Sequence, residues 1–236
     1  MTTASLFKWR HFAPEIILCG VRWYLRYALS YRDVEELLLE RGLHVDHTTV
    51  FRWVQRYAPE LDRRCRPSLR ATNDSYCVDE TYIKIKKQWY YLYRAVDSTG
   101  ATLDFMLSAT RDADAAERFF RQVLQASHTR TPRVITVDKH AAYPLAFDTL
   151  QQDGTLPETC LLRQCKYLNN VVEQDHRFVK RRVNPGLGFG VFATAQRTIQ
   201  GYEAMHMLHK GQIEGLAKGD VLAQNHVINQ MFGVAA

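Results

Sequence analysis

Three consecutive segments with the composition of β-strands most constrain how this chain can fold. Residues 75–85, 89–97 and 101–109 are rich in aromatic and β-branched side chains. Short polar segments, "KKQ" and "DSTG", separate them, so we expect an antiparallel meander. An amphipathic helix at 112–126 and a short apolar strand at 133–137 follow.

The next segments extend this region. They are a helix at about 141–152, a possible strand in "ETCLLRQ" and a strong helix in "LNNVVEQDHRFVKRRV". Three strands, a helix, a strand and further helices in this order predict an α/β class. The expected architecture is a mixed sheet with helices on its faces.

The N-terminal region has a different, all-helical pattern. Three helices are predicted in "PEIILCGVRWYLRYAL", "SYRDVEELLLERG" and "DHTTVFRWVQRYAPEL", with Ser30 and Asp46 as N-caps and Gly42 at a turn. The last of them places threonine and arginine on its exposed side. This arrangement favours a DNA-binding helix-turn-helix, and the alternative is a helical hairpin used for packing or dimerisation.

These patterns divide the chain into four parts. We expect a helix-turn-helix domain at 1–60, a linker at 61–73, a catalytic α/β domain at 74–210 and a C-terminal tail at 211–236. The linker is assigned because residues 58–71, which overlap it, contain two prolines and four arginines.

Charge and cysteine content narrow the class of protein. The net charge is +6, and the basic residues gather in the N-terminal region and after residue 160, which favours a polyanionic partner such as nucleic acid. The five cysteines form no paired CxxC pattern, so we expect free thiols. We expect neither a signal peptide nor a membrane span, so the predicted location is the cytoplasm.

Three carboxylates have unusual positions. Asp79 lies mid-strand in an apolar row, where a buried charge is costly unless it is compensated. Asp138 follows the carboxyl end of a short buried strand, where open α/β sheets bind ligands. Glu173 lies on the last helix of the region, two turns before Lys180. Singly, each acid has an ordinary explanation: an ion pair for Asp79, a helix cap for Asp138 and a capping box for Glu173.

Together the three acids indicate a metal site. Carboxylate oxygens are the ligands that Mg²⁺ and Mn²⁺ prefer, and two such ions can promote phosphodiester chemistry. Other acids fit less well. Glu80 alternates to the opposite face from Asp79, and the remaining rivals are Asp97, Asp104 and Asp175, of which Asp175 is the strongest.

The same motifs resemble a known family. "VDETYIKIKKQWYYLYRAVD", "TVDKHAAY" and "RQCKYLNNVVEQDHRFVKRRV" are similar to the three catalytic motifs of bacterial insertion-sequence DDE transposases. The 34 residues between Asp138 and Glu173, and the E-x6-K spacing from Glu173 to Lys180, also match. The resemblance is strongest to the insertion-sequence-six family and covers nearly the whole chain.

The resemblance implies a fold, an activity and a set of site residues. It implies a ribonuclease-H-like catalytic core in which Asp79, Asp138 and Glu173 bind Mg²⁺ or Mn²⁺, with two ions expected. It implies a polynucleotidyl transferase that cuts the element's ends, joins them to target DNA and forms cointegrates by replicative transposition. The partners would be double-stranded DNA and further copies of the chain. The expected DNA contacts are Arg163, Lys166, Arg177, Lys180, Arg181 and Arg182 near the catalytic site, and Thr48, Thr49, Arg52 and Arg56 in the helix-turn-helix.

Two other functions are consistent with parts of the pattern. A non-catalytic DNA-binding regulator would use the helix-turn-helix alone, and a metal-dependent nuclease would cut without strand transfer. The sequence also departs from the family at Gly190, where relatives often carry a lysine. If that lysine contacts DNA, its loss weakens activity.

Overall fold

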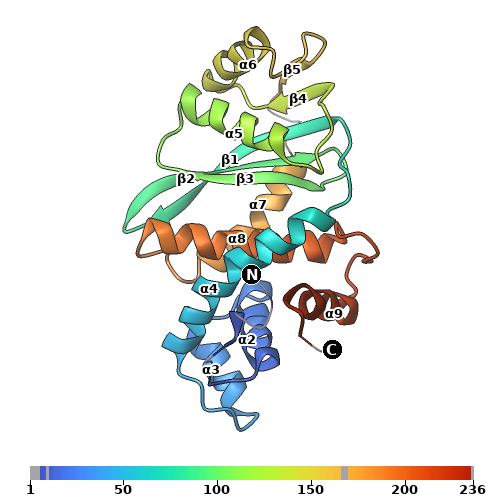
Figure 1. Cartoon of the computed structure of the whole chain (residues 1–236). Coiled ribbons are helices and arrows are strands. Elements are labelled where there is room, and N and C mark those ends of the chain that lie inside the picture. The colour runs from blue at the N-terminus through green and yellow to red at the C-terminus, as the bar shows by residue number, and fades with distance from the viewer. Residues whose placement is uncertain (1–5, 9–10, 166–169, 235–236) are drawn as a thin grey trace. The chain divides into compact units, whose positions relative to one another are not determined.

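The computed structural model describes residues 6–8, 11–165 and 170–234, and the chain divides into two compact units (Figure 1). The sheet unit comprises residues 70–183 and 187–189. The helical unit comprises residues 1–69, 184–186 and 190–236. Each unit is described by itself below.

The sheet unit contains one five-stranded mixed sheet with the order β3-β2-β1-β4-β5. The first three strands are antiparallel neighbours, whereas β4 runs parallel to both β1 and β5. The strands are β1 (Ser75–Ile85), β2 (Gln88–Asp97), β3 (Thr102–Ser108), β4 (Val134–Val137) and β5 (Leu161–Gln164). The meander and the short buried strand predicted from the sequence are therefore confirmed.

Helices cover both faces of this sheet (Figure 1). On one face, α5 (Ala113–Gln125) and α6 (Ala142–Gln152) share an apolar core with Tyr76 and Val78 of β1. Helix α7 (Asn170–Val183) covers the other face, where its Val172 packs on the sheet side chains that point to that side. Three antiparallel strands, two parallel strands and helices on both faces confirm the expected ribonuclease-H-like α/β class.

The helical unit begins with α2 (Pro14–Arg26), α3 (Tyr31–Leu39) and α4 (His47–Cys65). Ser30 forms a capping box with Asp33 at the start of α3, and Asp46 accepts the backbone N–H of Thr48 at the start of α4, so both predicted N-caps are confirmed. The α3–turn–α4 arrangement has the order of a helix-turn-helix.

The predicted linker is partly helical. Helix α4 continues through Pro59 to Cys65, and a 3₁₀ turn, Arg66–Ser68, follows it. The buried side chains of Leu61 and Cys65 hold this last part of the helix against the unit, which the arginine-rich composition did not reveal.

The helical unit also contains α8 (Phe192–Lys210) and α9 (Val221–Phe232). Gly201 allows α8 to approach the other helices closely, because a Cβ at this position would lie 2.5 Å from Cβ of Ala58 and 2.7 Å from a methyl of Leu25. Helix α8 thus packs with α2 and α4, although the expected catalytic domain ran to residue 210. The compact units and the predicted domains therefore differ in where they place residues 192–210.

In the parts of the chain that the structure describes, no helix is both long enough and apolar enough to cross a membrane.

Candidate active site

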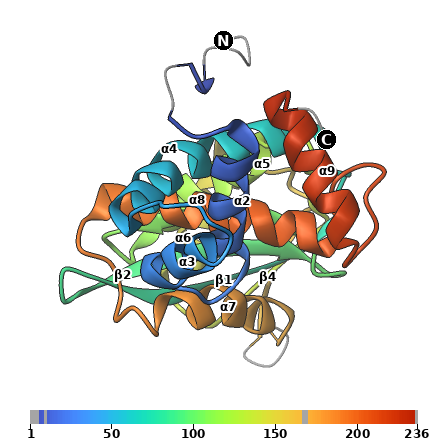
Figure 2. The same ribbon diagram turned by 90° about the horizontal axis from the view of Figure 1, so that it is seen from below.

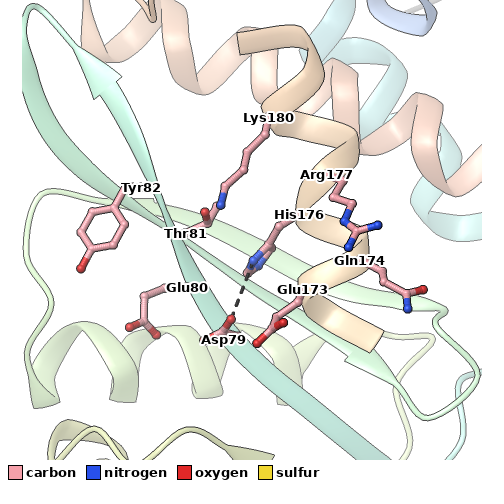
Figure 3. Close-up of a pocket in the computed structure, with 9 residues that line it drawn as sticks. All are labelled: Asp79, Glu80, Thr81, Tyr82, Glu173, Gln174, His176, Arg177 and Lys180. Carbon is pink, nitrogen blue, oxygen red and sulfur yellow. Dashed lines mark ion pairs between the residues drawn. The ribbon is translucent and has the colours of Figure 1, made fainter. Parts of the chain in front are cut away.

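Asp79 lies in the middle of β1, and its side chain faces α7 (Figure 3). It opens into a pocket with a volume of about 640 Å³ between the outer part of β1 and one side of α7. The lining combines acids and bases: Asp79, Glu80, Thr81, Tyr82, Glu173, Gln174, His176, Arg177 and Lys180. A pocket with both signs of charge can hold a cation and a phosphate side by side.

The electrostatic surroundings of Asp79 favour its protonated form. Burial, followed by the neighbouring carboxylates of Glu80, Asp138 and Glu173, raises the pKa of Asp79 to about 7. His176 Nδ1 lies 3.8 Å from the Asp79 carboxylate (dashed line in Figure 3). However, burial, together with the charges of Arg94 and Lys180, lowers the pKa of His176 to about 3, so this imidazole is neutral near pH 7. The contact with His176 therefore does not compensate the charge of Asp79.

Asp138 follows β4 directly, at the predicted position beside Asp79. Its carboxylate accepts the backbone N–H of His140 at 2.8 Å and lies 3.2 Å from an Nη atom of Arg111. Carboxylate oxygens of Asp79, Glu80 and Asp138 all lie within 4.8 Å of one another. Three acids at this spacing fit a divalent cation, which would relieve the charge repulsion that raises the pKa of Asp79.

Glu80 is closer to this cluster than side-chain alternation alone suggested. It does face the α5 and α6 side of the sheet, where it accepts a hydrogen bond from the hydroxyl of Tyr143 and pairs with Arg111. Yet its carboxylate also belongs to the group that includes Asp79 and Asp138. The strand twists and the carboxylates are flexible, so opposite faces of a strand do not by themselves separate two acids.

Glu173 lies in the first turn of α7 and points from the helix towards Asp79 (Figure 3). It is exposed, lines the pocket and contributes to the raised pKa of Asp79. The structure thus brings Asp79, Asp138 and Glu173 to one region from β1, the end of β4 and α7.

The rival acids have structural partners. Asp175 forms a buried ion pair with Arg94 of β2, at 2.6 Å. Asp97 accepts the backbone N–H groups of Asn73, Thr99 and Ala101 and so organises the turn after β2. Asp104 is buried on β3, where it accepts the backbone N–H of Phe105.

The basic residues expected to contact DNA near the acids differ in where their side chains lie. Lys180 and Arg177 line the pocket beside the acids, and Arg181 and Arg163 are exposed outside it. Arg182 instead donates to the carbonyl of Phe178 and lies over its ring. Lys166 lies outside the described residues.

The residues expected to read DNA bases lie at the start and middle of α4. Thr48 and Arg52 are exposed, and Thr49 is half-buried. The Thr48 hydroxyl donates to the N-cap Asp46, and Arg56 donates to the carbonyl of Leu6. Arg52 is exposed near this N-cap, where its charge adds to the hydrogen bonds from Thr48 that lower the pKa of Asp46.

Sequence reasoning missed three residues at the site. Arg111, just before α5, bridges Glu80 and Asp138, while Tyr143 and His176 contact Glu80 and Asp79 respectively. No spacing or composition signal distinguishes Arg111 from other surface arginines. His176 had a weak signal, since it lies three residues after Glu173 on the same helix.

Comparison with known proteins identifies the family of this chain. A family model described as a DDE domain matches residues 73–212. The transposase for the insertion sequence-like element IS431mec of Staphylococcus aureus is 38% identical over 206 residues, covering 87% of this chain and 89% of the relative. The chain belongs to the insertion-sequence-six family of DDE transposases. The transposase of IS257 in transposon Tn4003, also from Staphylococcus aureus, matches over the same proportions with 38% identity.

Membership of this family makes the protein a polynucleotidyl transferase. Solved structures with related folds include the magnesium complex of the HTLV-2 integrase catalytic core domain in its trimeric form. That core is 17% identical, with a TM-score of 0.44, and the match covers 59% of this chain and 87% of the integrase core.

Proposed function

We propose that this transposase binds the terminal inverted repeats of an insertion sequence and catalyses metal-dependent strand cleavage and strand transfer, with cointegrates as products. The observation that carries the proposal is the meeting of Asp79 and Asp138 within 4.8 Å, with Glu173 in the adjoining pocket. Carboxylates from separate segments repel one another at such distances, and a divalent cation bound among them would relieve that repulsion.

The proposed metal ligands are Asp79, Asp138 and Glu173. Bound there, one or two Mg²⁺ or Mn²⁺ ions would lower the pKa of the attacking water or 3′-hydroxyl and stabilise the leaving oxygen of the phosphodiester. Oxygen ligands alone do not distinguish these two metals.

The surrounding residues have separate roles in this proposal. Lys180 and Arg177 line the same pocket as the acids, so they can orient the scissile phosphate. His176 is buried and neutral, so it positions the Asp79 carboxylate without competing as a cation. The three groups thus hold the phosphate next to the acids and keep Asp79 aimed at it.

DNA selection would occur at the helix-turn-helix. Helix α4 would enter the major groove with Thr48, Thr49, Arg52 and Arg56 towards the bases, and Arg163, Lys166, Arg181 and Arg182 would supply phosphate contacts. Two DNA ends must be brought together, so a homo-oligomer is the proposed active form, acting in the bacterial cytoplasm on nucleoid DNA.

A transposition assay in cells tests the proposal. A donor plasmid carries the element with Asp79→Ala, Asp138→Ala or Glu173→Ala, and cointegrates with a second plasmid are counted. Each variant is expected to lower the frequency by at least about a thousand-fold, because a missing metal ligand removes most of the catalysis. Asp148→Ala is the matched control, since Asp148 is an exposed acid on α6 of the same unit.

The outcomes separate the competing functions. Wild-type frequency in any of the three acid variants contradicts the assigned site. A DNA-binding regulator predicts unchanged function in all of them. A nuclease predicts that the wild-type protein cuts DNA in a metal-dependent way but yields no joined product.

A further inference from the structure

The outer part of the β1–β2 hairpin extends beyond the other strands of the sheet (Figure 2). Strand β3 pairs with β2 only from Tyr91 onwards, and β4 pairs with β1 only over Ser75–Cys77. Residues 83–90 therefore form a two-stranded ribbon, which within the described residues has one further strand-like contact, from Ile85 to Phe189. Neither the fold nor the proposed chemistry accounts for the length of this ribbon.

Three aromatic rings gather on one face of the ribbon. We call Tyr82, Trp89 and Tyr91 the hairpin cluster. The Tyr82 ring lies 5.4 Å from that of Tyr91 and 6.2 Å, edge to face, from that of Trp89. Tyr82 and Trp89 are nevertheless 51% and 60% exposed, so large ring surfaces remain in contact with solvent.

Lysines surround the hairpin cluster. The Lys84 ammonium lies 5.8 Å from the centre of the Trp89 ring, and Lys86 and Lys87 form the turn. Both turn residues have positive φ, at 48° and 65°, a conformation that usually selects glycine or asparagine. Residues 81–91 contain no acid. The ribbon therefore presents a purely basic and aromatic surface at some conformational cost.

The ribbon is held in place by the segment after α7. The Phe189 N–H donates to the Lys84 carbonyl at 2.9 Å, and the Lys86 N–H donates to the Phe189 carbonyl at 2.7 Å. Gly188, with φ of 99°, makes this approach possible, because a Cβ there would lie 2.2 Å from the Lys84 carbonyl oxygen. Both segments belong to the sheet unit. These hydrogen bonds hold the ribbon in position, so the hairpin cluster lies on an ordered surface.

Cross-strand packing alone does not account for these residues. Aromatic pairs do stabilise two-stranded ribbons, which are marginal in water. However, rings that serve only this purpose gain by being covered, whereas Trp89 is even more exposed than its ring neighbour Tyr82. Three lysines at one end also repel each other, which weakens a purely structural ribbon.

We propose that the hairpin cluster stacks on unpaired bases of a DNA strand whose phosphates pair with Lys84, Lys86 and Lys87. Exposed rings beside cations are the usual elements of single-strand binding, since every base has a face to stack on, while paired bases in a duplex do not offer it. The charge of the ribbon complements DNA and disfavours a second copy of this basic chain.

Tyr82 connects this surface to the catalytic pocket. It belongs to the hairpin cluster and also lines the pocket, although its ring lies with Glu80 on the opposite side of β1 from Asp79 and Lys180 (Figure 3). Strand β4 pairs with β1 only as far as Cys77, so an unpaired DNA strand that crosses this edge of β1 beyond Cys77 would reach both sites. In that respect the inference rests on the proposed function, because it takes the strand to be the DNA that the acids process.

The test measures binding by the full chain without divalent metal. The probes are a fluorescein-labelled 20-nucleotide single strand and a blunt 20-base-pair duplex of the same sequence, followed by fluorescence anisotropy. Trp89→Thr removes the ring but keeps β propensity, and it is expected to weaken single-strand binding by about five- to a hundred-fold. Duplex binding is expected to change by less than about two-fold, because a duplex offers no unpaired base to stack on.

Two variants control for folding and for apolar exposure. Trp89→Phe keeps a stacking ring and is expected to retain most single-strand affinity. Leu145→Ala removes an apolar side chain that is 61% exposed on α6, and it is expected to leave both affinities unchanged. Melting temperatures of all variants are compared with that of the wild type.

Three results would overturn the inference. They are unchanged single-strand affinity in Trp89→Thr, equal losses for single strand and duplex, or a change of oligomeric state in sedimentation, which would assign the surface to a second copy. The two proposals can fail separately. If Trp89→Thr keeps its single-strand affinity while Asp79→Ala is inactive in transposition, the hairpin cluster is rejected and the proposed function stands. If Trp89→Thr selectively loses single-strand affinity while Asp79→Ala transposes normally, the proposed function is rejected and the binding surface stands.

Discussion

The two faces of the sheet are built from the same strands but differ in chemistry. The face under α5 and α6 carries a broad apolar core that includes Tyr93, Phe119 and Phe120. On the face under α7, Cys77, Val96 and Val172 form a smaller apolar cluster. Next to that cluster lie the half-buried Asp79 and the buried polar side chains of Arg94, Asp175 and His176.

The two faces therefore have different roles, one in the stability of the unit and the other in its chemistry. The apolar face can supply most of the free energy of folding of the sheet unit, because burial of apolar area is the main stabilising contribution. The α7 face keeps ionisable groups at fixed positions, which costs stability but prepares a site. Adjacent residues of β1 reach different faces, so a single strand contributes to both.

The largest expected effect on the α7 face comes from breaking its buried ion pair. Arg94→Met leaves Asp175 without its guanidinium partner, which should lower the free energy of unfolding by about 3–5 kcal/mol. Urea denaturation measures the loss. The double variant Arg94→Met/Asp175→Leu should recover most of it, since neither charge then remains buried. A double variant as unstable as the single one would show that the pair is not the reason.

A second effect tests whether the α7 face is destabilised by Asp79, the acid that we propose as a metal ligand. The folded-state pKa of Asp79, about 7, exceeds the unfolded value of 3.8, so the metal-free protein loses stability as pH rises from about 4 through about 7. Asp79→Asn removes that charge. It should therefore stabilise the metal-free protein by about 1–3 kcal/mol more at pH 8 than at pH 5.

Thermal unfolding in the presence of a chelator measures this difference. Glu158→Gln is a suitable control, because Glu158 is an exposed acid of the same unit. An equal effect of Asp79→Asn at both pH values would mean that Asp79 is not held at a raised pKa.

A smaller effect concerns the boundary between the faces, where Arg111 pairs with Glu80 and Asp138. Arg111→Met removes a cation that competes for these carboxylates. The Mg²⁺ concentration that half-saturates the rise in melting temperature should fall by about two- to five-fold, as expected for a partly exposed ion pair. Arg118→Met makes the same charge change on the exposed side of α5 and should not shift it. A higher Mg²⁺ requirement in Arg111→Met would contradict this role.

The smallest effect concerns Gly190, beyond both faces. A Cβ at Gly190 meets no atom within 4 Å, so a side chain fits without strain. Gly190→Lys should strengthen DNA binding by less than about 1 kcal/mol and increase the salt dependence by about one phosphate contact. Affinities at several salt concentrations measure both, with Gly190→Gln as the uncharged control. An unchanged slope would show that position 190 does not contact DNA.

Much of the sheet and of the first helices was predictable because their signals are local. The alternation in 75–85, the apolar strand ending before Asp138 and the caps at Ser30 and Asp46 each depend on neighbouring residues, and all appear in the structure. The positions of the acids relative to the strands and the last helix followed from the same local patterns.

The remainder depended on contacts between distant segments. Gly201 allows α8 to pack on α4 and α2, and nothing near Gly201 in the sequence indicates those partners. Arg111 follows β3 in the chain, whereas Glu80 lies on β1. The two side chains meet because β3 and β1 are both neighbours of β2 in the sheet. The proximity of Glu80 to Asp79 was underestimated for a different reason, because alternation gives the direction of a side chain but not the reach of its carboxylate.

The most direct measurement is strand transfer by the purified full chain with short duplexes of the element's ends, a target plasmid and Mg²⁺. The account predicts joined products for the wild type and none for Asp79→Ala, Asp138→Ala or Glu173→Ala, while all four proteins bind the ends in the presence of a chelator. Joined products from any of the three variants would contradict the assignment of the chemistry to these acids at the α7 face.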